Sequence, residues 1–206
     1  MTPTEKIKNL NVRMIHQTEQ LVKPARNILA SLTAEKCDIF HMVWGISGEL
    51  LELQLGILNE DMANVIEEAG DTEFYLAHLC RKLNIANNAG AILSSEYIEE
   101  YLASQTVEGR KYATSLTKLS ESLLNNCKKY IIYDDASRLE KIVAVVEEIR
   151  VVLNITYAVY DRTLSRPFGS LFTTVMENNF VKLSGDDGRY SDGYTDEAAK
   201  IRADKK

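Results

Sequence analysis

Four acidic residues occur as two pairs with the same spacing. Glu49 and Glu52 lie three positions apart, and so do Glu68 and Asp71. Residues three apart in an α-helix lie on one face about one turn apart, so each pair would present two carboxylates in one direction. Two antiparallel helices could bring all four together, and their repulsion would then require protons or cations. Mg²⁺ prefers such oxygen ligands and keeps positions open for water and phosphate, so the pattern predicts a magnesium site.

The segments that carry the two pairs have the hydrophobic spacing of helices. In residues 36–58 apolar side chains recur every three or four positions, and Thr33 is a residue type that favours helix N-termini. Residues 62–83 have the same spacing, and the turn-forming residues 59–61 separate the two segments. A short connection makes neighbouring helices antiparallel. We therefore expect a metal-binding helical hairpin over residues 33–85.

The rest of the chain also favours helix. Only three prolines and ten glycines occur in 206 residues, so helix breakers are few. We predict an all-α helical bundle that forms a single domain over residues 1–206, with a last helix and tail over residues 169–206. The further helical segments that we predict are residues 4–22, 96–102, 110–130, 137–164 (capped by Ser137) and 169–182, with a short segment at 25–32 after the first of them.

Composition argues against several classes of partner. The 30 acidic residues outnumber the 24 basic ones, which disfavours nucleic acid and anionic membranes. No apolar run approaches the roughly 18–20 residues that a membrane span needs, and the N-terminus does not resemble a secretory signal. The three cysteines, Cys37, Cys80 and Cys127, are odd in number and lack metal-ligand spacing. This pattern suits a reducing compartment better than a disulfide-bonded scaffold. We expect a cytoplasmic protein that binds neither nucleic acid nor membrane.

Glycines accompany the acidic pairs. Gly45 and Gly48 precede Glu49, and Gly70 adjoins Asp71, although glycine inside a helix costs about 1 kcal/mol relative to alanine. Their positions indicate that space is needed beside the acids. The alternative interpretation is that the acids are solvated surface charges and the glycines serve helix packing.

Two parts of the chain resemble a known family. The segments HMVWGISGELLELQ (41–54) and ANVIEEAGDTEFYLAHL (63–79) resemble the E-x-x-E, then E-x-x-D, signature of the all-α nucleoside triphosphate pyrophosphatases, particularly the MazG-like proteins common in phages. Fifteen residues separate Glu52 from Glu68, within the usual range of that family. Residues 178–202 resemble its closing segment, in which Asn-x-x-Lys-Leu is followed by Arg-Tyr, an aromatic residue and a late arginine.

The resemblance implies an activity and a set of site residues. The activity is Mg²⁺-dependent hydrolysis of a ribo- or deoxyribonucleoside triphosphate to the monophosphate and pyrophosphate, with Mn²⁺ as an alternative ion, in the host cytoplasm if the chain is phage-encoded. The implied catalytic metal ligands are Glu49, Glu52, Glu68 and Asp71. The implied substrate contacts are Asn179, Lys182, Arg189 and Tyr190 in the last helix and phosphate-contacting tail, and the alternative is an ordinary charged tail. Apart from the resemblance, His41 and Trp44 in the first helix of the hairpin are candidates for contact with the base, and the alternative is that they pack in the core or between helices.

Residues 110–165 lie between the two matching parts and read as a degenerate copy of the hairpin. Aligning the copies puts Leu119, Ser122, Glu148 and Val151 where the four acids stand, so three of four ligands are missing. One interpretation is a partner half that completes, as an internal pseudo-dimer, the bundle that compact relatives build as homo-oligomers. The other is that any two amphipathic hairpins look alike.

Other functions remain compatible with the sequence. Phosphoribosyl-ATP pyrophosphohydrolases have a similar fold and acidic cluster, and a non-catalytic helical scaffold derived from the family would have the same helices. The sequence has no glycine-rich phosphate loop, no Ser-His-Asp pattern and no zinc-ligand spacing, so nucleophilic and zinc chemistry are not expected.

Overall fold

The described part of the molecule is an all-α bundle, as predicted. The structure is a computed structural model that describes residues 5, 8, 9, 12–14, 30–90 and 110–184. These residues form five long helices and no strand. The helices are α2 (Ala34–Leu58), α3 (Met62–Leu83), α5 (Arg110–Ile132), α6 (Arg138–Thr163) and α7 (Ser170–Ser184).

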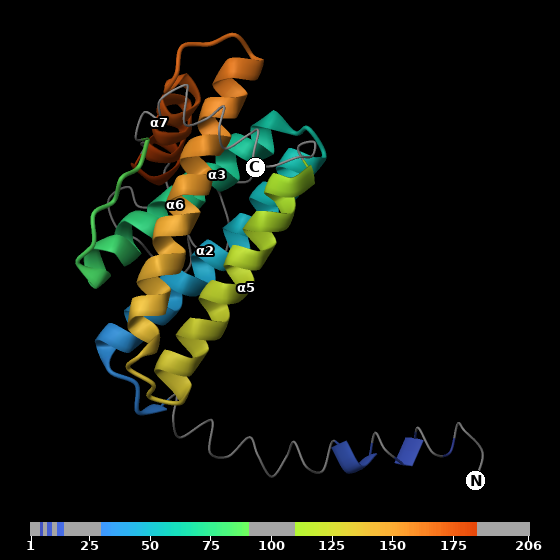
Figure 1. Ribbon diagram of the computed structural model, residues 1–206, viewed down its shortest axis with the longest axis vertical. Coiled ribbons are helices and arrows are strands. Elements are labelled where there is room, and N and C mark those ends of the chain that lie inside the picture. Colours follow the sequence, from blue (N-terminus) through green and yellow to red (C-terminus); the bar gives the residue numbers. More distant parts are fainter. Residues whose placement is uncertain (1–4, 6–7, 10–11, 15–29, 91–109, 185–206) are drawn as a thin grey trace.

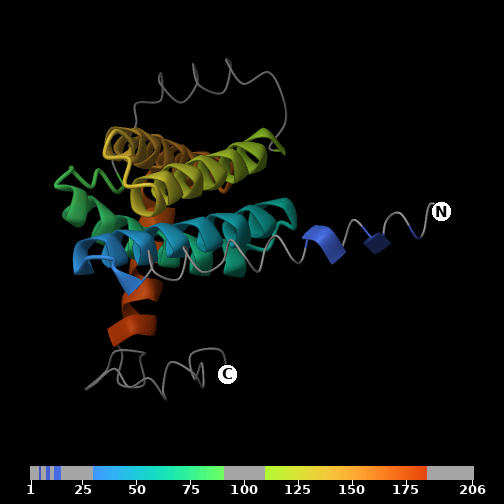
Figure 2. The ribbon, with the colours of Figure 1, turned by 90° about the horizontal axis from the view of Figure 1, so that it is seen from below.

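The helices are arranged as two hairpins and a crossing helix. Helices α2 and α3 form one antiparallel layer and α5 and α6 form the other, with α2 packed against α5 (Figure 1). Helix α7 runs across the two layers and packs against α3 and α6 (Figure 2). Helix α3 therefore lies between α2 on one side and α7 on the other. Within the described residues, no helix combines the length and the hydrophobicity of a membrane span.

Local signals set the ends of the first hairpin. The Thr33 side chain accepts a hydrogen bond from the Lys36 backbone N–H, and Asp61 does the same for Asn64 at the start of α3. Both are helix N-caps of the usual kind. Residues 59–61 form the predicted turn, with Glu60 at a φ of 57°.

The second hairpin differs from prediction at one helix start. Ser137 precedes α6, but its side chain makes no capping hydrogen bond. Its hydroxyl donates instead to Asp135, which lies in the turn, at 2.6 Å. Ser137 is therefore the N-cap residue of α6, as predicted, but its side chain does not cap the helix. The predicted helix at 4–22 and the short segment at 25–32 lie largely outside the described residues, and the predicted helix at 96–102 lies wholly outside them.

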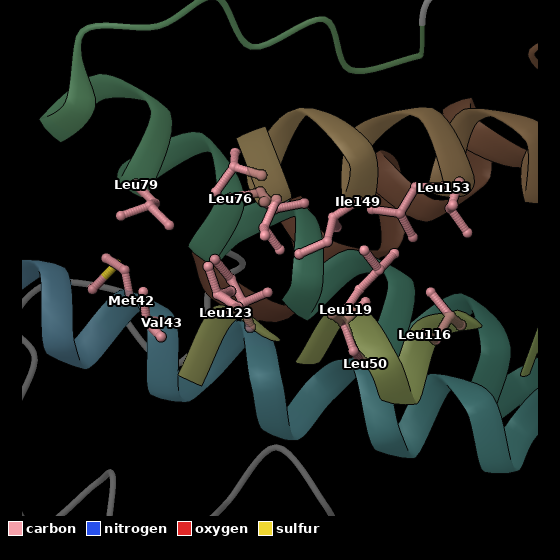
Figure 3. Close-up of a cluster of buried hydrophobic side chains, with 14 of the residues drawn as sticks. Met42, Val43, Leu50, Leu76, Leu79, Leu116, Leu119, Leu123, Ile149 and Leu153 are labelled. Carbon is pink, nitrogen blue, oxygen red and sulfur yellow. The ribbon is translucent and has the colours of Figure 1, made fainter. Parts of the chain in front are cut away.

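The hydrophobic core lies between the two hairpins (Figure 3). Leu50 and Leu76 from the first layer face Leu123, Ile149 and Leu153 from the second, and all five side chains are completely buried. Burial of a leucine stabilises a fold by roughly 1.5–3 kcal/mol. The second hairpin thus supplies the surface against which the hairpin with the acidic pairs is held.

A buried polar network joins the back of α3 to α6. Arg150 donates to both carboxylate oxygens of Glu73 at 2.6 Å, and the Tyr157 hydroxyl donates to Glu73 at 2.8 Å. Arg150 also donates to Asn87 at 2.6 Å, so the segment after α3 is held too. Separating the members of a buried ion pair leaves an uncompensated charge. A rotation of α3 that moves Glu73 away from Arg150 is therefore unfavourable.

Helix α7 is held at its N-terminus by α6. The buried Asp161 carboxylate accepts hydrogen bonds from the backbone N–H groups of Gly169 at 2.7 Å and Leu171 at 2.8 Å. An acidic group at this position satisfies free N–H donors and complements the helix dipole. Gly169 has a φ of 88°, a conformation that favours glycine. These contacts direct α7 across α3.

Neighbouring leucines in α5 provide a matched test of the core. Leu123 is fully buried and Leu124 is 39% exposed. We expect Leu123→Ala to lower the free energy of unfolding by about 2–5 kcal/mol, because it leaves a cavity. Leu124→Ala should cost about 1 kcal/mol or less. Urea denaturation measures both, and equal losses would contradict the assigned core.

Candidate metal centre

Three of the four paired acids meet between α2 and α3. One carboxylate oxygen from each of Glu49, Glu68 and Asp71 lies within 4.8 Å of the corresponding oxygens of the other two. Glu68 is buried, whereas Glu49 and Asp71 are half-buried. The antiparallel pairing of α2 and α3 brings residues from two helices together, and we call these three residues the carboxylate cluster.

Glu52 lies at the edge of the carboxylate cluster. It is exposed on α2 and is not among the three residues whose oxygens converge. Side chains three positions apart in a helix point in directions about 60° apart. Because Glu49 faces α3, Glu52 points further towards solvent. Its negative charge still helps to raise the pKa values of Glu49 and Glu68.

The carboxylate cluster is electrostatically unfavourable without a cation. Burial, a hydrogen bond with Glu49 and nearby negative charges raise the pKa of Glu68 to about 8. Burial also raises the pKa of Glu49. A proton on Glu68 therefore relieves the repulsion near neutral pH. A divalent cation would do the same, and a donor set made only of closely spaced oxygens fits Mg²⁺ or Mn²⁺.

Helix α7 adds a cation and an amide to the carboxylate cluster. The Lys182 ammonium donates to Asp71 at 2.8 Å and to Glu67 at 3.0 Å, and the Asn179 amide donates to Asp71 at 3.0 Å. Burial alone would lower the pKa of Lys182, but its bonds to these two carboxylates outweigh burial and raise the pKa. Lys182 therefore stays charged beside the carboxylate cluster.

Glu67 is a functional candidate that sequence reasoning missed. It lies one helical turn before Asp71 and shares Lys182 with it. The signal available in the sequence was the four-residue spacing from Glu67 to Asp71, which places both on one helix face. That spacing does not reveal that a lysine from α7 lies between them.

The glycines beside the acids have different roles. A Cβ atom on Gly70 would lie 2.9 Å from the Cβ of Asn179, so this glycine permits the close approach of α3 and α7. A Cβ atom on Gly45 would meet the Tyr75 ring at 2.7 Å. A Cβ atom on Gly48 would have no neighbour within 4 Å. Open space therefore lies beside the acids at Gly48, and close packing requires the other two glycines.

The remaining predicted substrate contacts are not in the carboxylate cluster. His41 and Trp44 are exposed on α2, about two turns and one turn before Glu49. The His41 ring lies 6.0 Å from the ring of Tyr75, and Trp44 packs edge-on against Phe40. The predicted contacts at positions 189 and 190 lie outside the described residues.

The second hairpin holds no equivalent acidic group among its described residues. Leu119 is buried in the core, Val151 is half-buried, and Glu148 is exposed. Ser122 accepts from the Asn126 amide within its own helix. These side chains offer no converging set of metal ligands.

Comparisons of the chain with protein-family models, with curated proteins and with solved structures give no match.

Two glycine substitutions should have opposite effects on stability. Alanine favours a helix interior by about 1 kcal/mol over glycine, so Gly48→Ala, which has room, should raise the free energy of unfolding. Gly70→Ala should lower it, because the added methyl group displaces Asn179 and α7. Thermal or urea unfolding distinguishes them, and stabilisation by Gly70→Ala would contradict the described contact between α3 and α7.

The raised pKa of Glu68 predicts a pH-dependent stability. In the folded, metal-free protein the pKa of Glu68 is about 8, which is above the ordinary value of 4.5. The resulting stabilisation is complete below the lower value and is lost as the pH rises through the higher one. In EDTA, unfolding free energy should therefore fall over this range more steeply for the wild type than for Glu68→Gln, whose amide does not ionise. Parallel curves in urea titrations would contradict the assignment.

Proposed function

We propose that the chain is a Mg²⁺-dependent nucleoside triphosphate pyrophosphohydrolase of the MazG-like type. The observation that carries this proposal is the convergence of Glu49, Glu68 and Asp71 beside the charged Lys182. Hydrolysis of a triphosphate needs two things that this arrangement offers. Carboxylates can hold a cation that neutralises phosphate charge, and a nearby ammonium can bind a phosphate oxygen.

The residues divide into three roles. Glu49, Glu68 and Asp71 would hold Mg²⁺, which screens phosphate charge and activates water when bound. Lys182 and Asn179 would donate hydrogen bonds to the triphosphate. Both reach the carboxylate cluster from α7 and already contact Asp71.

Glu52 is our candidate for the general base. It lies at the solvent-exposed edge of the carboxylate cluster, where a carboxylate can take a proton from an attacking water and release it to solvent. In the reaction that the family resemblance implies, water cleaves the phosphoanhydride bond between the α and β phosphates. The water oxygen bonds to one of these two phosphorus atoms, the bridging oxygen leaves with the other, and Glu52 takes the proton, so that the products are the monophosphate and pyrophosphate.

Turnover of a nucleotide panel tests this function. The wild type with Mg²⁺ should release pyrophosphate from at least one canonical or modified deoxynucleoside triphosphate, and EDTA should abolish the release. Glu68→Gln and Asp71→Asn should lower kcat/KM by roughly 100-fold or more, because a metal contributes several kcal/mol to such a reaction.

Glu148→Gln is the matched control. Glu148 is an exposed glutamate on α6, at the position that sequence alignment pairs with Glu68, so its substitution should leave turnover unchanged. No turnover of any nucleotide, or wild-type turnover by Asp71→Asn, would instead favour a non-catalytic helical scaffold.

A further inference from the structure

A pocket of about 230 Å³ lies between α3 and α7, outside the carboxylate cluster. Its lining comes from the first half of α3 and the second half of α7. The lining residues are Ala63, Ile66, Glu67, Asn178, Asn179 and Lys182.

The pocket shares a wall with the candidate metal centre. Lys182 and Asn179 line it, and both also donate hydrogen bonds to Asp71. On α3, Ala63, Glu67 and Asp71 follow one another at four-residue intervals, so they lie along one face of the helix. The pocket therefore begins about one turn, roughly 5.4 Å, from Asp71. A molecule with one end at the carboxylate cluster can place its other end in this pocket.

The lining suits an uncharged group. The two charged lining residues, Glu67 and Lys182, form an ion pair at 3.0 Å, and the Lys182 ammonium also bonds to Asp71 at the carboxylate cluster, where the proposed function has it meet the triphosphate. The Asn178 side chain carries both hydrogen-bond donors and an acceptor, and Ala63 and Ile66 are apolar. An amide beside apolar side chains favours a ring with polar edges.

The size of the pocket also favours one part of a nucleotide over a whole nucleotide. Sites that enclose whole drug-sized ligands measure roughly 300–1,000 Å³, which is larger than this pocket. It can therefore hold part of a nucleotide, such as a base or a base with some of its sugar, while the rest lies at the carboxylate cluster and in solvent.

We propose that the pocket between α3 and α7 binds the nucleoside end of the substrate, with Asn178 reading the edge of the base. This inference rests on the proposed function, because it assumes that the triphosphate lies at the carboxylate cluster. It assigns base recognition to α3 and α7 and not to His41 and Trp44 on α2.

A bulky residue at Ala63 tests the pocket. Ala63 is exposed in the first turn of α3, so Ala63→Trp should fill the pocket without disturbing the core. It should raise KM for the preferred nucleoside triphosphate by roughly tenfold or more, as expected when a binding pocket is blocked, with a smaller change in kcat. Inhibition by pyrophosphate with Mg²⁺ should be unchanged, because pyrophosphate has no nucleoside.

Ala77→Trp is the matched control. Ala77 is an exposed alanine on the same helix, beyond Asp71 and away from the pocket, and its substitution should leave KM unchanged. If Ala63→Trp fails to fold, Asn178→Ala replaces it. Asn178→Ala should change the ratio of kcat/KM values between two bases by several-fold, while pyrophosphate inhibition stays the same.

The outcomes separate the two proposals. A wild type that hydrolyses no nucleotide overturns the proposed function, and the pocket assignment fails with it. A wild type that is active, together with an unchanged KM in Ala63→Trp and unchanged base preference in Asn178→Ala, overturns only the pocket assignment. Loss of base preference in Trp44→Ala alone would place the base on α2 and would also overturn it.

Discussion

Like charges held at close range between α2 and α3 are the constraint on which the rest of the site depends. Carboxylates this close repel strongly when little water screens them. The protein compensates by a proton on Glu68 and by Lys182 and Asn179, which contact Asp71. Both compensations are replaceable, because a divalent cation can displace the proton and a phosphate can attract the lysine. The site can therefore bind a cation together with an anionic ligand.

The remainder of the fold keeps these charges in place against their repulsion. The second hairpin buries the apolar faces of α2 and α3, and the buried Arg150–Glu73 pair holds α3 from behind. Asp161 holds the start of α7 and thereby directs its far end, with Lys182, to the carboxylate cluster. Interactions far from the metal centre therefore stabilise an arrangement that the acids alone would oppose.

The helices could be predicted from local signals in the sequence, whereas the contacts between distant segments could not. Thr33 and the turn at residues 59–61 mark the first hairpin in the sequence, and hydrophobic spacing identifies its two helices. The outward rotation of Glu52 depends on which face of α2 meets α3, and spacing alone does not give this. Lys182 lies 111 positions from Asp71, so only the family resemblance drew attention to it.

The metal-binding property of the carboxylate cluster can be measured without any substrate. Titration of the metal-free protein with Mn²⁺, followed by the electron paramagnetic resonance signal of the free ion, should show saturable binding that Mg²⁺ competes away. Glu68→Gln and Asp71→Asn should each weaken it strongly, and Glu148→Gln should not. Absence of saturable binding in the wild type, or equal binding in all four proteins, would contradict the central claim that these three carboxylates form a cation site.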